Sequence, residues 1–528
     1  MNLGQRPPAY RELYPDGMDP FTRQFASNGA SRMIGHPDEE DDHYKDHDVG
    51  QHLDHQRSHD RQRTPSARSS DGDQTAPDGH RLTDLGHGHR LINRYGEDVR
   101  YVSTWGKWIT YSDGRWVLDN DGVNITRLAA SIGADIIDMR NLVGRGEHRQ
   151  LVDAALRLES AHGAAAAASM ARTIEGVAIE HSQLDADPMV LNVRNGTINL
   201  MTGAIDEHKP IDLLTKQAAV DYDERALATT FTAFVERIMP DVEVRSFVQR
   251  LLGYSITGKV TEHVLPIAHG AGANGKTTLT NIVAGVLGDY AVAASRDLLV
   301  AQRHASHPTG VTDLFRARFA HSGEIGLDAR LDEAFVKSLT GGDEQRARRM
   351  REDFWSFLPT HTFWLHANHR PIIRGTDDGI WRRLLLIPFG VQIPEDERDP
   401  GLTERILETE SAGVLRWLLE GLADYHIQGL SAPAQVVAAT KAYRDESDTV
   451  NQFISQELNL TPNGVIKSII LTERHRSWCV EEGVPARDID AHLKGVYKRL
   501  TGLGAEPKRV AGNRSWIGVQ QADETPGF

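Results

Sequence analysis

The chain has 528 residues, of which 39% are hydrophobic and 25% charged, and its formal net charge is −15. At roughly 150 residues per domain, this length predicts three to four domains of an ordinary globular protein. The acidic balance excludes a global basic field for nucleic acid, so any bound DNA must be held by a local patch or an inner channel.

Several features of the chain concern its compartment. The opening stretch MNLGQRPPAYREL has no apolar core after a basic start, so we expect no secretory signal. No run approaches the ~20 apolar residues that a bilayer span needs, so we expect no membrane contact. Cys479 is the single cysteine, and one thiol makes neither an intrachain disulfide nor a zinc site built on cysteines. These features favour a reducing cytoplasm.

Residues 1–90 differ in composition from the rest of the chain. Between Gly35 and His80 apolar residues are few, and Asp, His, Arg, Ser and Gly dominate. Such a stretch cannot bury enough apolar surface to offset the entropy of ordering, so we predict a disordered, His- and Asp-rich tail. Transition-metal binding by the histidines is the alternative to a merely solvated tail.

Residues 91–228 predict an N-terminal α+β domain. Aromatic and polar residues alternate over 101–120 around Ser112–Asp113–Gly114, a pattern typical of a hairpin. The run 126–182 is helical in character and includes an alanine-rich stretch. A second hairpin is predicted over 191–205, with Asn195–Gly196 at its turn.

Residues 229–430 predict a helical collar followed by an α/β ATPase core. Helices are expected at 229–238 and 241–253, and apolar strands then alternate with helices. The predicted strands are 263–269, 318–325, 363–368 and 383–389, and the predicted helices are 276–288 and 402–427.

Residues 431–528 predict a helical linker and a winged helix. A helix near 434–457 precedes two amphipathic helices, at 472–483 and 488–504, and a hairpin at 508–520. Winged helices often place their second helix in the major groove, although they also dock proteins. The basic residues of this unit are Lys494, Lys498, Arg499, Lys508, Arg509 and Arg514.

The segment GAGANGKT, residues 270–277, matches the phosphate-binding loop G-x-x-x-x-G-K-[ST] between a predicted strand and helix. Its glycines let backbone amides approach phosphates, and the helix N-terminus adds positive potential. Lys276 is expected to reach the β/γ-phosphates, and Thr277 to hold Mg²⁺. The predicted ATP-binding residues are Gly270, Ala271, Gly272, Ala273, Asn274, Gly275, Lys276, Thr277 and Thr278.

Two further polar residues follow predicted strands. A nucleotide site needs an acid for the metal and the attacking water, and Glu324 is the candidate; a capping role is the alternative. Asn368 lies at a strand tip, suited to orienting water beside the γ-phosphate. A structural role in a turn is equally compatible with the pattern around Asn368.

The ordered motifs GAGANGKTTL, FAHSGEI, VKSLTGGDEQRARRM, FWLHANHRP and DDGIWRRLLLIPF resemble the superfamily 3 helicases. They are most similar to the C-terminal helicase part of the phage and plasmid primase–helicase family, which has poxviral relatives. The resemblance extends through WVLDN, LNVRNGTINLMTG and AYRDESDTVNQFI, and covers about residues 95–460. It implies an AAA+-like, P-loop ATPase core.

The resemblance also implies roles for single residues. Lys276 and Thr277 match the phosphate-loop lysine and the Mg²⁺ hydroxyl, Glu324 matches the catalytic, metal-associated carboxylate, and Asn368 matches the polar sensor. Arg383 matches the arginine finger that reaches a neighbouring subunit, with Arg382 as the competing candidate. The chain departs from the family in having Gly323 where many members have a second acid, which places direct metal coordination in question.

In members of this family, a β-hairpin between the second and third motifs grips DNA in a central channel. Here that region contains Arg348, Arg349 and Arg351 after a Gly–Gly–Asp turn, and clustered arginines suit phosphate contact. A solvated charged face, paired with nearby acids, is the alternative.

The function implied by the resemblance is an ATP-dependent DNA helicase of phage, prophage or plasmid replication, acting on single-stranded and forked DNA. The implied cofactors are ATP and Mg²⁺, and the implied assembly is a homohexameric ring. Residues 1–90 are too short and polar for a primase domain, so priming would fall to a separate primase. The alternative is an ATP-switched initiator or packaging ATPase that does not unwind DNA.

Overall fold

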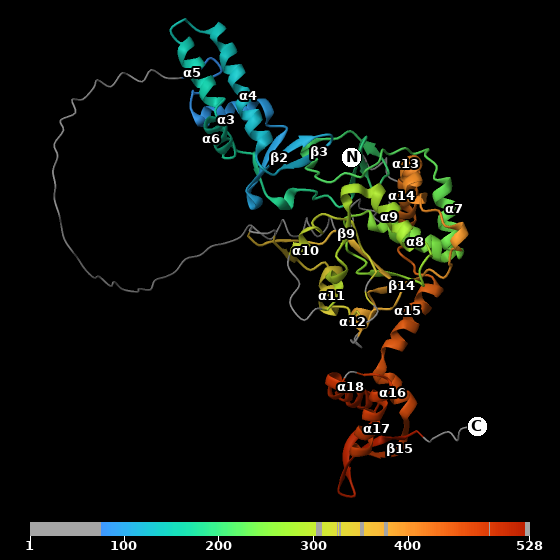
Figure 1. Cartoon of the computed structure of the whole chain (residues 1–528). Coiled ribbons are helices and arrows are strands. Elements are labelled where there is room, and N and C mark those ends of the chain that lie inside the picture. Colours follow the sequence, from blue (N-terminus) through green and yellow to red (C-terminus); the bar gives the residue numbers. More distant parts are fainter. Residues whose placement is uncertain are drawn as a thin grey trace, which may run out of the picture. The chain divides into compact units, whose positions relative to one another are not determined.

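The structure is a computed structural model that describes residues 75–301, 309–324, 326, 329–348, 353–373, 378–484 and 486–522. Its contacts divide the chain into two compact units, Met1–Gly96 with Asp121–Val177, and Glu97–Asn120 with Ala178–Phe528. The helices of the first unit run from blue to cyan in Figure 1. Most of the predicted tail, residues 1–74, lies outside the described residues. No helix in the described part of the chain is both long and apolar enough to cross a bilayer.

The first unit contains helices α3 (Asp84–Tyr95), α4 (Val123–Asp138), α5 (His148–Leu158) and α6 (Ala161–Ala171). The predicted boundary at residue 90 is therefore wrong, because α3 begins at Asp84. Its glycines permit close helix packing: a Cβ on Gly88 would lie 2.9 Å from the backbone nitrogen of Ala171 in α6. Buried Arg90 pairs with Asp78 at 2.6 Å, a tertiary contact that composition does not reveal.

Two N-terminal truncations test where the folded part of the chain begins. Deleting residues 1–74 should leave thermal stability and ATP turnover near those of the full chain, because that stretch is poor in apolar residues. Deleting residues 1–90 removes half of α3 with its buried Arg90. A loss of 1 kcal/mol lowers the melting temperature of a unit this small by about 4–8 °C. Equal melting curves for the two truncations would show that residues 75–90 do not stabilise the first unit.

The second unit begins with two small sheets. Strands β1 (Val99–Val102), β2 (Lys107–Ser112), β3 (Arg115–Asp119) and β4 (Ala178–Ile179) form one sheet in the order β3-β2-β1-β4. Strands β5 (Val190–Val193), β6 (Gly196–Asn199) and β7 (Ile205–Asp206) form the other. Both predicted hairpins are confirmed. The predicted helical run to residue 182 instead ends at Ala171, and the single domain predicted over 91–228 is divided between the two units.

The central sheet is parallel and five-stranded, in the order β14-β8-β13-β10-β9. Its strands are β8 (Leu265–His269), β9 (Ala291–Ala294), β10 (Phe319–Ser322), β13 (Thr362–Ala367) and β14 (Leu384–Pro388). The four predicted strands are confirmed, and β9 was missed because its sequence AVAA is short and weakly patterned. This mixed α/β architecture is consistent with a P-loop-like core.

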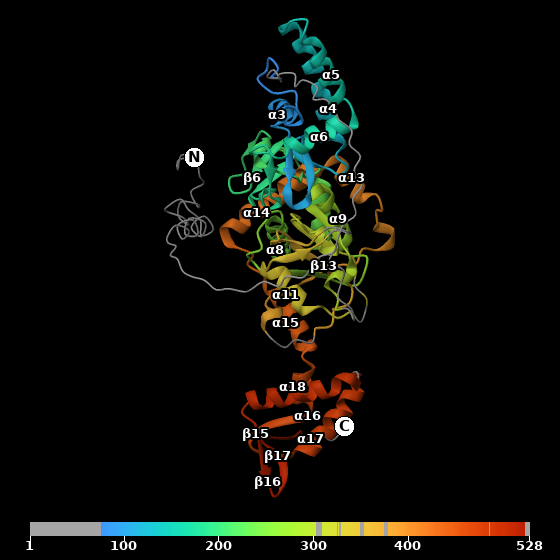
Figure 2. The same ribbon diagram turned by 90° about the vertical axis from the view of Figure 1, so that its left-hand side faces the viewer.

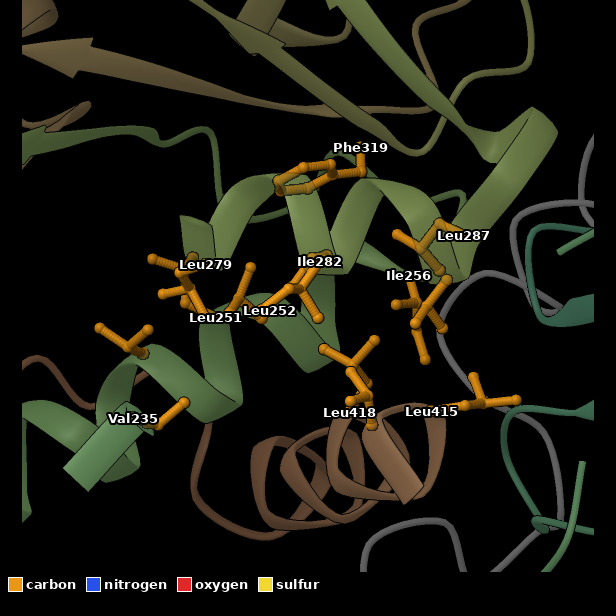
Figure 3. Close-up of a cluster of buried hydrophobic side chains, with 14 of the residues drawn as sticks. Val235, Leu251, Leu252, Ile256, Leu279, Ile282, Leu287, Phe319, Leu415 and Leu418 are labelled. Atoms are coloured by element: carbon orange, nitrogen blue, oxygen red, sulfur yellow. The ribbon is translucent and has the colours of Figure 1, made fainter. Parts of the chain in front are cut away.

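Helices pack against the first helix of this core. Helix α9 (Lys276–Leu287) follows β8 and contacts α13 (Leu402–Thr409) and α14 (Ser411–Gln428). Helices α7 (Thr229–Ile238) and α8 (Val242–Ser255) share one buried hydrophobic cluster with it. Figure 3 shows Leu279 and Ile282 of α9 facing leucines of α8 and α14. These side chains are buried, so the helix that follows the phosphate loop is held from two sides.

Helix α15 (Ala434–Ser447) leads to a C-terminal module, red in Figures 1 and 2. Its elements are α16 (Thr449–Glu457), β15 (Leu458–Lys467), α17 (Ser468–Glu481), α18 (Ile489–Gly502), β16 (Glu506–Val510) and β17 (Asn513–Gln521). The strands form an antiparallel sheet in the order β15-β17-β16. The module has its own buried cluster, centred on Phe453, Trp478 and Leu500. The two predicted amphipathic helices and the hairpin are confirmed. The helix predicted near 434–457 is divided at Asp448 into α15 and α16, and β15 is an addition.

Candidate nucleotide site

The phosphate loop joins the carboxyl end of β8 to the N-terminus of α9. Gly272, Ala273 and Gly275 have φ values of 44°, 51° and 80°, so the loop folds through left-handed conformations. A Cβ on Gly270 would lie 2.3 Å from the carbonyl oxygen of Phe389, which makes glycine necessary there. The result is a tight turn whose amides precede a helix N-terminus, the arrangement that binds anions.

Lys276 and Asn368, predicted separately from two motifs, meet in the structure. The Lys276 Nζ donates to the Gly270 carbonyl at 2.6 Å and to Asn368 Oδ1 at 2.9 Å. The Gly272 amide also donates to Asn368 Oδ1, at 3.4 Å. The contact follows from topology, because β8 and β13 are adjacent parallel strands and both residues follow their carboxyl ends. Burial lowers the pKa of Lys276, and the charge of Glu324 opposes that shift.

The other predicted site residues differ in exposure. Thr277 is exposed on the first turn of α9, with half-buried Thr278 beside it. Glu324 is exposed just beyond β10, at the same edge of the sheet. Asn274 is buried and its Nδ2 donates to the Phe389 carbonyl at 3.3 Å, so its side chain stabilises the loop instead of facing a ligand.

The two candidate finger arginines differ sharply. Arg383 is 9% exposed; its Nε donates to Thr340 Oγ1 at 3.1 Å and its Nη1 to the Gly379 carbonyl at 2.5 Å. A guanidinium engaged inside its own chain is poorly placed to reach another subunit, whereas Arg382 is exposed. The geometry therefore favours Arg382 over the Arg383 predicted first.

Both arginines lie far from the phosphate loop of their own chain. They precede β14, whereas the loop follows β8, and these strands are parallel neighbours in register. Five residues of strand extend roughly 17 Å at about 3.3 Å per residue. Both arginines therefore lie at the opposite edge of the sheet from the phosphate loop.

The region between Glu324 and Asn368 contains helix α11 (Glu333–Gly341) and an antiparallel hairpin of β11 (Gln345–Ala347) and β12 (Trp355–Phe357). The guanidinium carbons of Arg346 and Arg348 lie 4.4 and 4.6 Å from the ring centroid of Phe354, which is 44% exposed. Arg349 and Arg351 lie outside the described residues. The hairpin that the resemblance implies is present, and it presents cations beside an exposed aromatic ring.

Sequence reasoning missed the histidines of the core strands. His321 on β10 and His366 on β13 have ring centroids 6.1 Å apart. Burial, followed by the charges of His321 and Lys276, lowers the pKa of His366 to about 4. These rings are therefore neutral at neutral pH and add no charge beside the phosphate loop. The sequence did contain a signal for them, because both histidines lie in predicted strands that are followed by candidate site residues.

Comparison with known proteins supports the resemblance. Residues 88–240 match the family described as "D5 N terminal like". A candidate helicase of Acanthamoeba polyphaga mimivirus is 26% identical over 321 residues, which cover 56% of this chain and 33% of the relative. A candidate primase of African swine fever virus is 27% identical over 307 residues, covering 53% of this chain and 32% of the relative.

A candidate helicase of Frog virus 3 is 24% identical over 277 residues, covering 48% of this chain and 28% of the relative. The chain thus spans about a third of the length of the curated relatives it matches. The solved "A form apo structure of NrS-1 C terminal region-CTR" covers 82% of this chain and 99% of its own, at 11% identity and a TM-score of 0.47. The sequence matches confirm the similarity to viral primase–helicases that the motifs predict.

Proposed function

We propose that this relative of viral primase–helicases is an ATP-hydrolysing helicase motor for DNA replication. The contact between the Lys276 Nζ and Asn368 Oδ1 supports the proposal most directly. It joins a phosphate-binding cation to a polar sensor at the carboxyl edge of a parallel sheet, where nucleotides bind in such folds.

Each residue has a distinct role in the proposed reaction. Lys276 exchanges its contacts with Gly270 and Asn368 for oxygens of the β/γ-phosphates, and Asn368 then orients the attacking water. Glu324 accepts a proton from that water. Thr277 and Glu324 fit Mg²⁺, an oxygen-seeking ion, which would neutralise developing phosphate charge. Because Gly323 replaces a second acid, Glu324 would act on the ion alone or through water.

The position of Arg382 supports a ring of identical subunits. Its guanidinium would stabilise the charge that develops on the γ-phosphate of the neighbouring subunit, as an arginine finger does. We propose a hexamer that encircles one DNA strand. Arg383, in this account, instead holds β14 to the last turn of α11 through Thr340.

The β11–β12 hairpin is the proposed contact with single-stranded DNA. Phe354 with Arg346 and Arg348 offers a stacking surface and charge, which is how sequence-tolerant single-strand binding works. The hairpin base packs on aromatic residues, with Phe315 and Trp355 ring centroids 5.0 Å apart. Helix α11, whose Thr340 accepts from Arg383, leads directly into β11, so the hairpin is continuous with the edge of the sheet that carries the two arginines.

Replacing Arg348, Arg349 and Arg351 with alanine should uncouple the motor. DNA-stimulated hydrolysis and strand separation should fall, while hydrolysis without DNA survives. Single-strand affinity should weaken for all sequences alike, and the salt dependence should become shallower by about 0.7 per lost phosphate contact. Fluorescence anisotropy across a salt series measures both. Normal unwinding by the triple variant would rule out the hairpin as the DNA contact.

The C-terminal module is proposed to be a winged helix that binds duplex DNA. Lys494 and Lys498 on α18 are exposed, as are Lys508, Arg509 and Arg514 on the β16–β17 hairpin. Arg499, by contrast, donates to Asp448 at 2.8 Å and belongs to the module's own structure.

Replacing Lys508, Arg509 and Arg514 with alanine is the matched control for the β11–β12 triple variant. It should weaken duplex binding and leave single-strand affinity unchanged.

The competing function is an initiator or packaging ATPase that uses ATP as an assembly switch. A forked duplex with a labelled strand separates the two: a motor displaces the strand with ATP and not with a non-hydrolysable analogue. Equal displacement with both nucleotides, or none with either, would favour the switch. Priming is not proposed for this chain, and a separate primase would supply primers.

A further inference from the structure

Three side chains with metal-binding atoms converge in the C-terminal module, away from the nucleotide site. His475 and Cys479 lie one turn apart on α17, and His492 lies on α18. Their ligand atoms all lie within 4.8 Å of one another, and this is the one such group of His, Cys, Asp and Glu found among the described residues. His475 and Cys479 are fully buried.

The three ligand atoms lie close to one another. His475 Nε2 lies 2.8 Å from His492 Nδ1 and 3.3 Å from Cys479 Sγ. Tetrahedral zinc with bonds of about 2.0–2.1 Å to nitrogen and 2.3 Å to sulfur separates such atoms by roughly 3.4 and 3.6 Å. Opening the cluster by about half an ångström, through small side-chain rotations, would therefore admit an ion.

Groups around the cluster match the outer shell of a metal site. His492 Nε2 lies 3.0 Å from Thr449 Oγ1, and donation to that hydroxyl leaves His492 Nδ1 free of a proton. Aromatic rings enclose the cluster: the Phe453 and His475 ring centroids are 5.2 Å apart, and those of Trp478 and His492 are 5.7 Å apart. Such an apolar shell restricts water and strengthens ligand–metal attraction.

A cysteine ligates a metal as the thiolate, so metal binding at Cys479 would release a proton as the sulfur–metal bond forms.

We propose that His475, Cys479 and His492 bind one zinc-class metal ion, with water as the fourth ligand, and that this ion pins α17 to α18. A single cysteine cannot form a zinc site built on several cysteines, but it can serve as one ligand beside two histidines. Since α18 carries exposed Lys494 and Lys498, the ion would fix the helix that is proposed to face duplex DNA. That last consequence rests on the proposed function; the metal site itself does not.

Cobalt(II) titration of the full, EDTA-treated chain tests the site. Because Cys479 is the only cysteine, a thiolate-to-cobalt charge-transfer band can arise from this cluster alone, and the histidine-rich N-terminal segment cannot mimic it. We expect the band to saturate at one equivalent, to disappear when Zn²⁺ is added, and to accompany release of one proton. No band at one equivalent would overturn the proposal.

Variants locate the remaining ligands. Cys479→Ser should remove the band. Thr449→Val changes a residue that contacts a ligand and not the metal, so it should lower cobalt affinity by about tenfold to a hundredfold. His492→Gln removes a ligand and should lower cobalt affinity by more than that. Zn²⁺ should raise the melting temperature of the natural chain and not of Cys479→Ser, measured on proteins with matching circular dichroism in EDTA. A band of unchanged affinity in His492→Gln would exclude His492 and overturn the three-ligand site.

Discussion

Replacing Lys276 with alanine is expected to abolish ATP hydrolysis while the chain stays folded. Lys276 is 2% exposed beside the phosphate loop, and the position of its ammonium group next to Asn368 is set by two adjacent strands. Removing one preorganised cationic contact to a transition state costs about 100- to 1,000-fold in rate, and loss of phosphate binding adds to this. Phosphate release, with and without DNA, measures the effect.

The matched control is Lys441→Ala, which removes the same charge from an exposed position on α15. It should turn over ATP normally. In Lys276→Ala, the Gly270 carbonyl and Asn368 Oδ1 lose one donor each at the mouth of the loop, so we expect only a modest fall in melting temperature. Near-normal turnover in a folded Lys276→Ala protein would end the phosphate-loop interpretation.

Arg382→Ala should also abolish turnover, yet leave ATP binding intact. A finger arginine contributes about a thousandfold or more to hydrolysis, and acts on the nucleotide of the adjacent subunit. Mixing Arg382→Ala with Lys276→Ala should restore part of the activity, because some interfaces then combine an intact lysine with an intact arginine. Absence of rescue in fully exchanged mixtures would contradict a role between subunits.

Arg383→Ala is the matched comparison, since it is the adjacent residue with the same charge. Its guanidinium donates to Thr340 and Gly379 inside the chain, so its loss removes two charge-assisted hydrogen bonds, each typically contributing about 1.5–3 kcal/mol. We expect a lower melting temperature as its first effect. If Arg383→Ala were stable, inactive and rescued by Lys276→Ala, while Arg382→Ala remained active, the finger would be Arg383.

Local pattern was enough for the parts of the fold that follow from periodicity. The glycines of 270–275 between an apolar strand and a helix identify a phosphate loop, because that motif encodes its own geometry. The strands at 263–269, 363–368 and 383–389 are continuous apolar runs, as strands buried on both faces must be. The hairpin turn at Asp113–Gly114 is likewise local, whereas the second hairpin turns at Arg194 and Asn195, one residue before the predicted Asn195–Gly196.

Elements that depend on distant partners could not be predicted. Helix α3 begins at Asp84 in a polar, glycine-rich stretch because α6 approaches Gly88 and because Asp78 pairs with Arg90. Strand β9 is too short to show a period, and it forms through pairing with β10. In both cases tertiary contacts override weak local propensity.

The sequence by itself predicted which residues are expected to meet a nucleotide, because a motif specifies residue types at close spacing. Only the tertiary structure distinguished Arg382 from Arg383: the two are neighbours in sequence, but the Arg382 side chain is exposed and that of Arg383 is buried. It also brought His492 to His475 and Cys479, across a helix–helix contact that no spacing rule describes. Burial and convergence arise when separate elements pack together, and one-dimensional patterns do not contain them.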